Sequence, residues 1–466
     1  MHRDVLTYLA EWRNRPSRKP LVIRGARQVG KTWLVRRFAK QFENYIEINC
    51  ETESSTCALL RDYPPAKALD LLCIKRNASL IPGKTLLFID EIQSSPDVFA
   101  RLRYFYEQVP ELHIVAAGSL LEFVLEEHEF SMPVGRIEYL HLGPATFSEF
   151  LRAVGRDRLA RYLDHHSVGE QIPEAIHQEC ITLLKSYLVI GGMPESITEY
   201  ARESRFVDSD RIKQNIQATY VDDFRKYGRA VKHDLLELAF RAIPGLVGRK
   251  LKYADISRDH RAKDIAAALH MLVLARVCTL VTHSSCTGVP LGATADQKVF
   301  KPLYLDVGLQ CSARGLNMLD IERLDAFSLV NSGSVCEQFI GQHLQYHEEP
   351  YMQPELYYWA REKPASSAEV DYALSSGTTI VPIEVKAGKT GSLRSLHLFC
   401  SERNAPLAVR FNMDLPSLVR ATGKLPTGKP YDYHLLSLPC YMVGQCRRLI
   451  RDTLSSDALG NVSDRR

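Results

Sequence analysis

Eight consecutive residues match the spacing of a phosphate-binding loop, G-x-x-x-x-G-K-S/T. They are Gly25, Ala26, Arg27, Gln28, Val29, Gly30, Lys31 and Thr32. The apolar run at 20–24 predicts a buried strand before this loop, and residues 32–40 have helical composition after it. Backbone N–H groups of such a loop point at phosphate oxygens, and the helix N-terminus adds partial positive charge. The motif therefore predicts an ATP site, in which Lys31 reaches the β- and γ-phosphates and Thr32 ligates Mg²⁺.

An acidic pair, Asp90 and Glu91, follows the apolar run at residues 86–89. Such a run is typical of a central strand in a parallel sheet, and these sheets bind ligands beyond the carboxyl ends of their strands. We expect Asp90 to hold Mg²⁺ through water and Glu91 to orient or deprotonate the attacking water. The alternative is an acid pair that only caps the next helix.

Two further residues are candidates for the same site. Ser119 ends the apolar strand expected at 113–119 and could contact the γ-phosphate or the attacking water, with a plain turn serine as the alternative. Arg136 could reach phosphate within its own subunit or from a neighbouring subunit of a homo-oligomer. A surface arginine without a catalytic role is the alternative for this residue.

A second constellation lies in the last third of the chain. Strand alternation puts Glu384 and Lys386 on one face, where Asp371 from a neighbouring strand could meet them and Glu337 could approach from a helix. Carboxylates beside a lysine can bind Mg²⁺ and activate water for phosphodiester hydrolysis. Asp371, Glu384 and Lys386 are therefore candidate catalytic residues, and Glu337 joins the two acids as a candidate metal ligand. The alternative is an exposed, charged strand end.

The order of the strands and helices expected around these residues predicts an α/β protein. Strands expected at 20–24, 45–49, 86–90, 113–119 and 137–142 alternate with helices, which implies a parallel P-loop NTPase sheet. Four domains are predicted: an ATPase core at 1–145, a helical lid at 146–230, a winged-helix-like unit at 231–312 and a mixed α/β unit at 313–466.

Composition adds little about partners at the level of the whole chain. The 466 residues are 45% hydrophobic and 24% charged with a net charge of +4, which is ordinary for a globular protein. Residues 225–263, however, hold eleven Lys or Arg against four Asp or Glu. A basic face on a winged helix predicts contacts with DNA phosphates, whereas a solvated unit that only packs on the ATPase core is the alternative.

The cysteines and apolar runs indicate a cytoplasmic location. None of the eleven cysteines forms a C-x-x-C pair, which is typical of reduced thiols rather than disulfides or a zinc site. No apolar run approaches about 18 residues, and the N-terminus lacks the apolar segment of a secretory signal. We therefore expect no membrane association.

These motifs resemble a bacterial and archaeal family that couples an AAA+/STAND-like ATPase domain to a winged helix and a C-terminal PD-(D/E)XK nuclease-like domain. The resemblance spans nearly the whole chain and rests on residues 25–32, 87–93, 117–119, 135–136, 191–194, 369–371 and 382–386. It implies ATP binding and hydrolysis, and it places Gly192 and Pro194 near the adenine. It also implies a restriction-endonuclease-like last domain, whose site would comprise Glu337, Asp371, Glu384 and Lys386.

Two functions stay open at this level. The first is an ATP-dependent, DNA-associated protein in which nucleotide state controls a nuclease-like domain. The second is a STAND-type regulatory or signalling switch whose C-terminal domain binds a partner without cleaving it. A metabolic kinase is disfavoured, because Asp90 and Glu91 are the acid pair of a water-activating ATPase and no acceptor site is evident.

Overall fold

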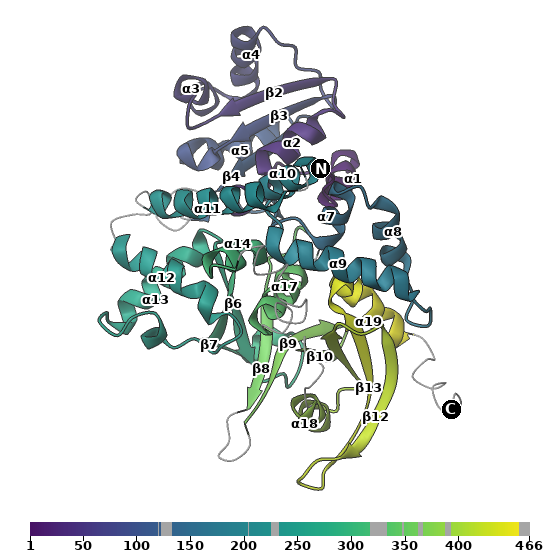
Figure 1. The fold of residues 1–466 in the computed structure, drawn as a ribbon. Helices are drawn as coiled ribbons and strands as arrows, with labels where there is room; N and C mark the ends of the chain where they lie inside the picture. The colour runs from purple at the N-terminus through teal and green to yellow at the C-terminus, as the bar shows by residue number, and fades with distance from the viewer. Residues whose placement is uncertain are drawn as a thin grey trace.

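The computed structural model describes residues 1–119, 121–122, 133–203, 205–224, 233–316, 333–346, 349–361, 367–386 and 393–455. Within these ranges the chain forms two β-sheets. Figure 1 shows the N-terminal sheet at the top, the second sheet at the bottom and a layer of helices between them.

The N-terminal sheet has five parallel strands in the order β2-β3-β4-β1-β5, which confirms the predicted parallel α/β sheet. The strands are β1 (Leu21–Arg24), β2 (Asn44–Asn49), β3 (Thr85–Asp90), β4 (His113–Gly118) and β5 (Glu138–His141). Every residue of β3 and β4 is buried, as their apolar runs predicted. Because all five strands run the same way, the carboxyl ends of β1, β3 and β4 meet at one edge of the sheet.

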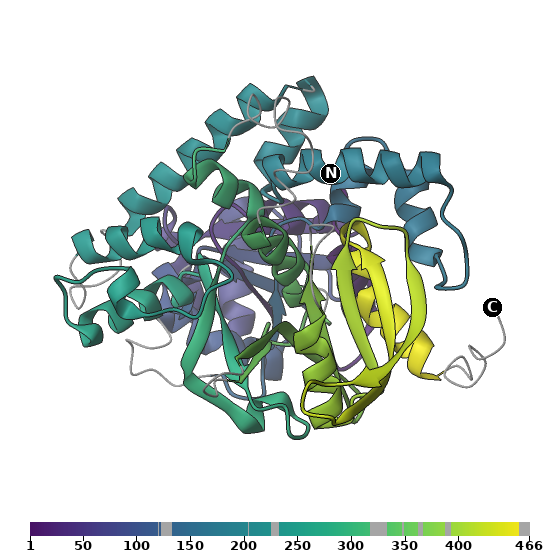
Figure 2. The same cartoon turned by 60° about the horizontal axis from the view of Figure 1, so that its bottom comes forward.

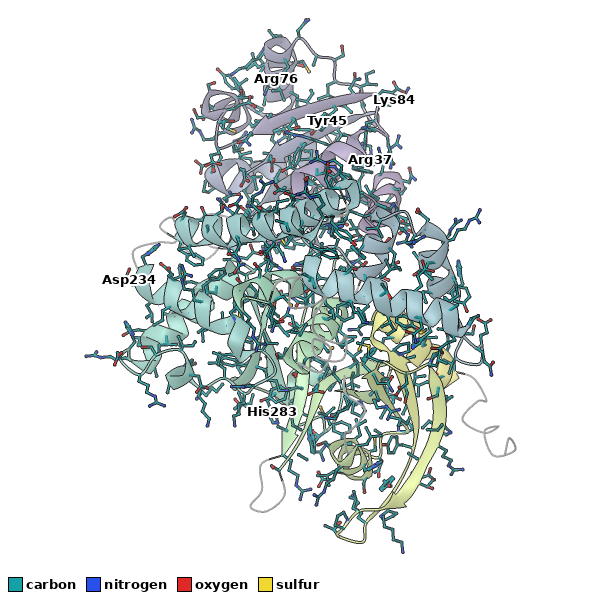
Figure 3. All side chains as sticks on the ribbon, viewed as in Figure 1. Arg37, Tyr45, Arg76, Lys84, Asp234 and His283 are labelled. Carbon is teal, nitrogen blue, oxygen red and sulfur yellow. The ribbon has the colours of Figure 1, made fainter. Side chains whose placement is uncertain are left out.

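Alternating side chains of these strands enter two separate cores. Leu21, Ile23 and Phe88 pack in one core with helices α1 (Val5–Asn14) and α2 (Lys31–Ala39). Their neighbours in sequence face the other core, which is covered by α3 (Ser54–Asp62), α4 (Pro65–Arg76) and α5 (Pro96–Gln108). Helices α3 and α4 are separated just before Pro65, whose missing N–H suits the first turn of α4. Charged side chains such as Arg37, Arg76 and Lys84 lie on the outside of this domain (Figure 3).

The middle layer is helical. It comprises α7 (Phe147–Ala153), α8 (Asp157–His165), α9 (Glu174–Ile190), α10 (Pro194–Glu203) and α11 (Phe206–Asp223). Pro194 is the first residue of α10, as expected from its fixed φ. The assignment of residues 146–230 as a lid stays a prediction.

Two helices and a hairpin follow. The helices are α12 (His233–Leu246) and α13 (Ala262–Leu274), and the hairpin strands are β6 (Cys278–Ser284) and β7 (Ala295–Tyr304). Helix α12 continues through Pro244. Helix α14 (Val307–Ala313) begins three residues after β7.

The second sheet is mixed and has eight strands in the order β12-β13-β11-β10-β9-β8-β6-β7. Its remaining strands are β8 (Leu356–Arg361), β9 (Ala368–Ser376), β10 (Thr379–Val385), β11 (Leu407–Asn412), β12 (Ser417–Lys424) and β13 (Pro430–Pro439). Strands β12 and β13 were not predicted. The β6–β7 hairpin lies where the predicted winged-helix-like unit would have its wing, but it forms an edge of this sheet, because β6 pairs in parallel with β8. The predicted units 231–312 and 313–466 therefore share one sheet, with β7 and β12 at its opposite edges (Figure 2).

Three helices accompany the second sheet: α17 (Gly333–Tyr346), α18 (Arg394–Arg403) and α19 (Cys446–Ser455). Helix α17 contributes Phe339, Ile340 and Leu344 to the same continuous core as α9 and α14, so the second sheet is joined to the helical layer by apolar packing. Among the described helices, none has both the length and the apolar composition that crossing a bilayer requires.

Candidate functional site

The predicted phosphate-binding loop lies between β1 and α2, with Lys31 as the first helical residue. Gly30 has a φ of 91°, and Gln28 also adopts positive φ, so the loop curls tightly before the helix begins. The Lys31 ammonium is buried and donates to the carbonyl oxygens of Gly25 and Ala26, both at 2.8 Å. Burial lowers the pKa of Lys31 to about 8, although the nearby carboxylates of Glu91 and Asp90 oppose the shift.

Thr32 and Asp90 form the predicted metal-binding pair. The Thr32 hydroxyl donates to Asp90 Oδ2 at 2.8 Å, so a helix start and a strand end place two oxygen ligands together. Burial raises the pKa of Asp90, and the hydrogen bond from Thr32 opposes that shift. Hydroxyl and carboxylate oxygens suit Mg²⁺, which usually completes its shell with water and substrate phosphates. These residues therefore fit the ion that the loop motif implies.

Glu91 lies directly beside this pair and is held in place by two polar groups. The Gln93 amide donates to Glu91 Oε2 at 2.5 Å, and the Ser119 hydroxyl donates to the same oxygen at 3.5 Å. Glu91 itself has a φ of 47°, which turns the chain sharply after β3. The structure thus brings Lys31, Asp90, Glu91 and Ser119 to one edge of the sheet.

The loop 191–194 lies against the phosphate-binding loop. A Cβ placed on Gly30 would lie 3.4 Å from Cγ of Pro194, so this proline contacts the turn that precedes α2. The Gly192 carbonyl accepts from the Ala145 N–H at 2.6 Å, and the Gly192 N–H donates to Asp306 at 2.6 Å. Gly192 and Pro194 are therefore beside the loop, while their contact with adenine stays a prediction.

Acidic and basic side chains converge at the second predicted constellation. Lys386 Nζ lies 2.5 Å from Glu384 Oε1, and Asp371 Oδ2 accepts the Val385 N–H at 2.7 Å. A second lysine, Lys301 of β7, lies among the same carboxylates. Its ammonium is 3.1 Å from Glu337 Oε1 and 3.8 Å from Asp371 Oδ1, and it also pairs with Glu369.

Burial and mutual repulsion raise the pKa values of two carboxyl groups in this cluster. Burial and repulsion from Asp371 raise the pKa of Glu337 to about 7 and that of Glu384 to about 8. Burial alone would lower the pKa of Lys301, but Glu337, Asp371 and Glu369 raise it above its usual value. Lys301 is therefore charged at neutral pH and compensates the acids from within the protein.

The arrangement bears directly on metal binding at this cluster. Within the part of the chain that the structure describes, no group of three or more His, Cys, Asp or Glu side chains is arranged to hold a metal ion. Glu337, Asp371 and Glu384 lie in one cluster, and Lys301 and Lys386 offset part of their negative charge. Their role as metal ligands stays a prediction.

Comparison with known families covers each part of the chain separately. Residues 17–151 match a family model described as an AAA domain. This match spans the whole five-stranded parallel sheet, and we call this region the AAA domain. Residues 181–320 and 332–422 match two domains of unknown function, DUF8612 and DUF4143. No protein of curated function shows significant similarity to the chain.

Several solved structures are similar at low identity. The Walker-type ATPase PABY2304 of Pyrococcus abyssi is 17% identical, with 66% of this chain and 94% of that chain covered and a TM-score of 0.43. The Aeropyrum pernix ORC2 protein is 13% identical, with 68% and 92% covered and a TM-score of 0.32. A STAND protein from Pyrococcus horikoshii is also 13% identical, with 73% and 47% covered and a TM-score of 0.25.

Arg136 lies at the wrong edge of the AAA domain to serve its own subunit. It precedes β5, and the parallel register pairs Glu138 with Leu21, so Arg136 is near the start of β1 whereas the phosphate-binding loop follows its end. Its side chain is partly exposed and pairs with Glu107 at 2.9 Å. The same-subunit alternative is therefore wrong, and action on a neighbouring subunit stays a prediction.

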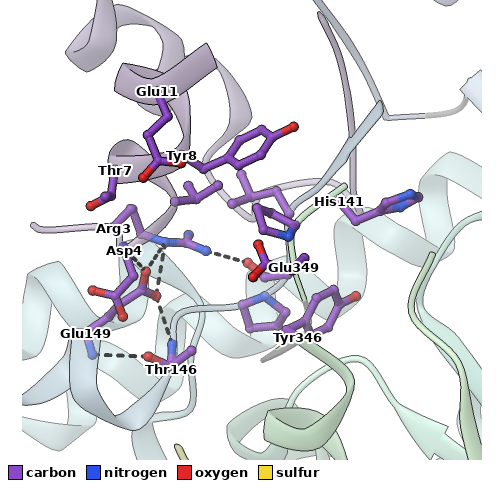
Figure 4. Close-up of a pocket in the computed structure, with 15 residues that line it drawn as sticks. Arg3, Asp4, Thr7, Tyr8, Glu11, His141, Thr146, Glu149, Tyr346 and Glu349 are labelled. Carbon is purple, nitrogen blue, oxygen red and sulfur yellow. Dashed lines mark hydrogen bonds and ion pairs between the residues drawn. The ribbon is translucent and has the colours of Figure 1, made fainter. Parts of the chain in front are cut away.

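Sequence reasoning missed a buried ion pair that supports the AAA domain's loop. Arg3 donates to the carbonyl oxygens of Val29 at 3.0 Å and Gly143 at 2.8 Å, and it pairs with Glu149 at 3.1 Å. Figure 4 shows this group beside a pocket that Tyr8 and Tyr346 also line. The capping box from Thr146 to Glu149 is a readable sequence signal, but its arginine partner comes from a distant segment.

The basic segment is only partly within the described residues. Residues 225–232 lie outside them, while Arg249, Lys252, Arg258, Arg261 and Lys263 are exposed around α13. Asp234 of α12 is exposed in the same part of the molecule (Figure 3). Asp255, Asp259 and Asp264 are exposed as well, so within residues 249–264 five exposed basic side chains outnumber three exposed acidic ones.

Proposed function

We propose that this chain is an ATP-hydrolysing AAA protein that associates with DNA and whose nucleotide state controls its nuclease-like C-terminal unit. The observation that carries the ATPase part is the convergence of Lys31, Thr32, Asp90, Glu91 and Ser119 at one sheet edge. Their types and order are those of a P-loop enzyme that activates water.

The chemistry follows from where each group lies. Lys31 exchanges its contacts with two loop carbonyls for the β- and γ-phosphates, whose charge it stabilises. Glu91 accepts a proton from the water that attacks the γ-phosphorus, while Gln93 and Ser119 hold its carboxylate. Thr32 and Asp90 would hold Mg²⁺, which supplies neutralisation of phosphate charge.

The DNA part of the proposal rests on the exposed basic side chains near α13. Changing Arg249, Lys250 and Lys252 together to Ala should weaken duplex DNA binding and flatten its salt dependence. Each lost phosphate contact reduces the slope of log K against log salt by about 0.9. Fluorescence anisotropy at several salt concentrations measures both quantities.

The control is Arg156, Arg158 and Arg161 changed to Ala, which removes the same charge from exposed positions near α8. Equal weakening by both variants would mean that overall charge, not this surface, binds DNA.

Control of a C-terminal nuclease is tested at Asp371, which contacts both the β10 backbone and Lys301. If the acid cluster cleaves DNA, Asp371→Ala should abolish Mn²⁺- or Mg²⁺-dependent cleavage and leave ATP turnover within about twofold, because the two sites are built on different sheets. Asp432→Ala, at an exposed position of β13, is the matched control. The measurement is nicking of single- and double-stranded DNA with and without ATP.

One observation favours the alternative of a regulatory switch with a non-cleaving module. Lys301 supplies a built-in cation among Glu337, Glu369 and Asp371, so part of the acidic charge is compensated without a metal ion. In that case the wild-type protein cleaves no DNA under any metal condition, and Asp371→Ala changes stability alone.

A further inference from the structure

The turn between β7 and α14 carries a fully buried carboxylate, Asp306, which lies outside the catalytic groups described above. Its Oδ1 accepts the Leu309 N–H at 3.0 Å and so caps α14. Its Oδ2 accepts the Gly192 N–H at 2.6 Å and the Gln342 amide at 3.2 Å. One carboxylate thus joins three parts of the chain: the start of α14, helix α17, and the loop 191–194 that contacts the AAA domain. Helix α17 belongs to the unit built on the second sheet.

The backbones at this junction touch so closely that only glycine fits. A Cβ on Gly191 would lie 2.1 Å from Asp306 Oδ1, and a Cβ on Gly308 would lie 2.5 Å from the Gly191 nitrogen. Gly191 also has a φ of 78°, a conformation that side chains disfavour. The start of α14 and the loop 191–194 therefore form one rigid contact.

The same loop reaches the phosphate-binding loop two residues later. Pro194 packs on Gly30, while the Gly192 carbonyl is held by the Ala145 N–H. A displacement of Gly192 would therefore move Pro194 relative to the site for the nucleotide.

Asp306 is itself held by a series of buried contacts between β7 and α17. Gln338 both accepts from the Tyr304 N–H and donates to the Tyr304 carbonyl, at 2.8 and 2.7 Å. Gln342 accepts the Val307 N–H at 2.9 Å while it donates to Asp306. The carboxylate is thus fixed from two sides, which makes it a stiff support for the loop.

We propose that Asp306 is a positioning residue for nucleotide binding: it holds the loop 191–194 against the phosphate-binding loop, so that the second sheet's unit completes the ATP site. This inference rests on the proposed ATPase function. It also goes beyond that function, because it makes nucleotide affinity depend on a residue outside the AAA domain. The loop should set affinity rather than the chemical step, since none of its side chains approaches Glu91 among the contacts described.

Asp306→Ser is the test variant. A serine hydroxyl can still cap α14, but it is too short to keep the bond to Gly192 as well. Asp306→Asn, which keeps the volume but turns a donor toward a donor, is the second variant. The control is Gln338→Ala, which removes the neighbouring contact with Tyr304 and leaves Gly192 untouched.

The measurements are the Kd for a fluorescent ADP analogue, the steady-state KM and kcat for ATP, and the Tm of each protein without nucleotide. We expect both Asp306 variants to raise Kd and KM at least tenfold with kcat within about threefold. Gln338→Ala should lower the Tm by about as much as the Asp306 variants do. Its Kd should stay within about twofold of wild type.

Two results would overturn the inference. One is a Kd for Asp306→Ser or Asp306→Asn within about twofold of wild type. The other is equal weakening in Gln338→Ala, which would show a general loosening of the fold instead of a specific support. A wild-type protein that binds no nucleotide would instead refute the proposed function, and this inference with it.

Discussion

Lys31→Ala should leave the protein folded and weaken ATP binding about 100-fold, with turnover too slow to measure at cellular ATP concentrations. The ammonium is buried and donates to the carbonyl oxygens of Gly25 and Ala26, inside the curl of the loop. A hydrogen bond to a charged group is worth about 1.5–3 kcal/mol, and phosphate offers several such contacts. Isothermal titration with ATP and a phosphate-release assay measure the two effects.

The fold should tolerate this change because the buried ammonium contributes little to stability. Burial lowers the pKa of Lys31 to about 8, which reflects the cost of keeping the charge away from water. Lys40→Ala, at the exposed end of the same helix, is the matched control and should bind ATP as wild type does. Unchanged ATP affinity in a folded Lys31→Ala protein would refute the assignment of the loop.

The part of the site that sequence could predict is the part carried by local pattern. The loop motif fixes Lys31 at a helix start, and an apolar run that ends in acids fixes Asp90 and Glu91 at a strand end. Strand alternation likewise brought Glu384 and Lys386 to one face beside Asp371. In each case a period or a spacing within a few residues determines the geometry.

The residues that sequence could not supply are those brought in by distant pairing. Lys301 reaches the acid cluster only because β6 pairs with β8, which places β7 in the second sheet. Asp306 meets the Gly192 N–H, and Arg3 the Gly143 carbonyl, across more than a hundred residues. No local spacing encodes such contacts, because a buried carboxylate and a buried guanidinium look like surface residues in a sequence.

These distant contacts also change how the two candidate sites relate. Glu337, which contacts Lys301, and Gln342, which contacts Asp306, lie on the same helix, α17. The acid cluster and Asp306, which supports the loop 191–194, are therefore both attached to helix α17. A control of the C-terminal unit by nucleotide needs such an element, whether that unit cleaves DNA or only binds a partner.

Glu91→Gln should bind ATP with near wild-type affinity and hydrolyse it about 10²–10⁴-fold more slowly, the usual cost of losing a positioned base. Glutamine keeps the shape, and its carbonyl oxygen can still accept from the Gln93 amide, so the turn after β3 should survive. Thr32 and Asp90 are unchanged and still suit Mg²⁺. Single-turnover phosphate release, together with ATP titration, separates the chemical step from binding.

Asp70→Asn, an exposed carboxylate-to-amide change on α4, is the matched control. Turnover at the wild-type rate in Glu91→Gln would place the catalytic base elsewhere, whereas loss of ATP binding would show that Glu91 supports the site's structure instead of its chemistry.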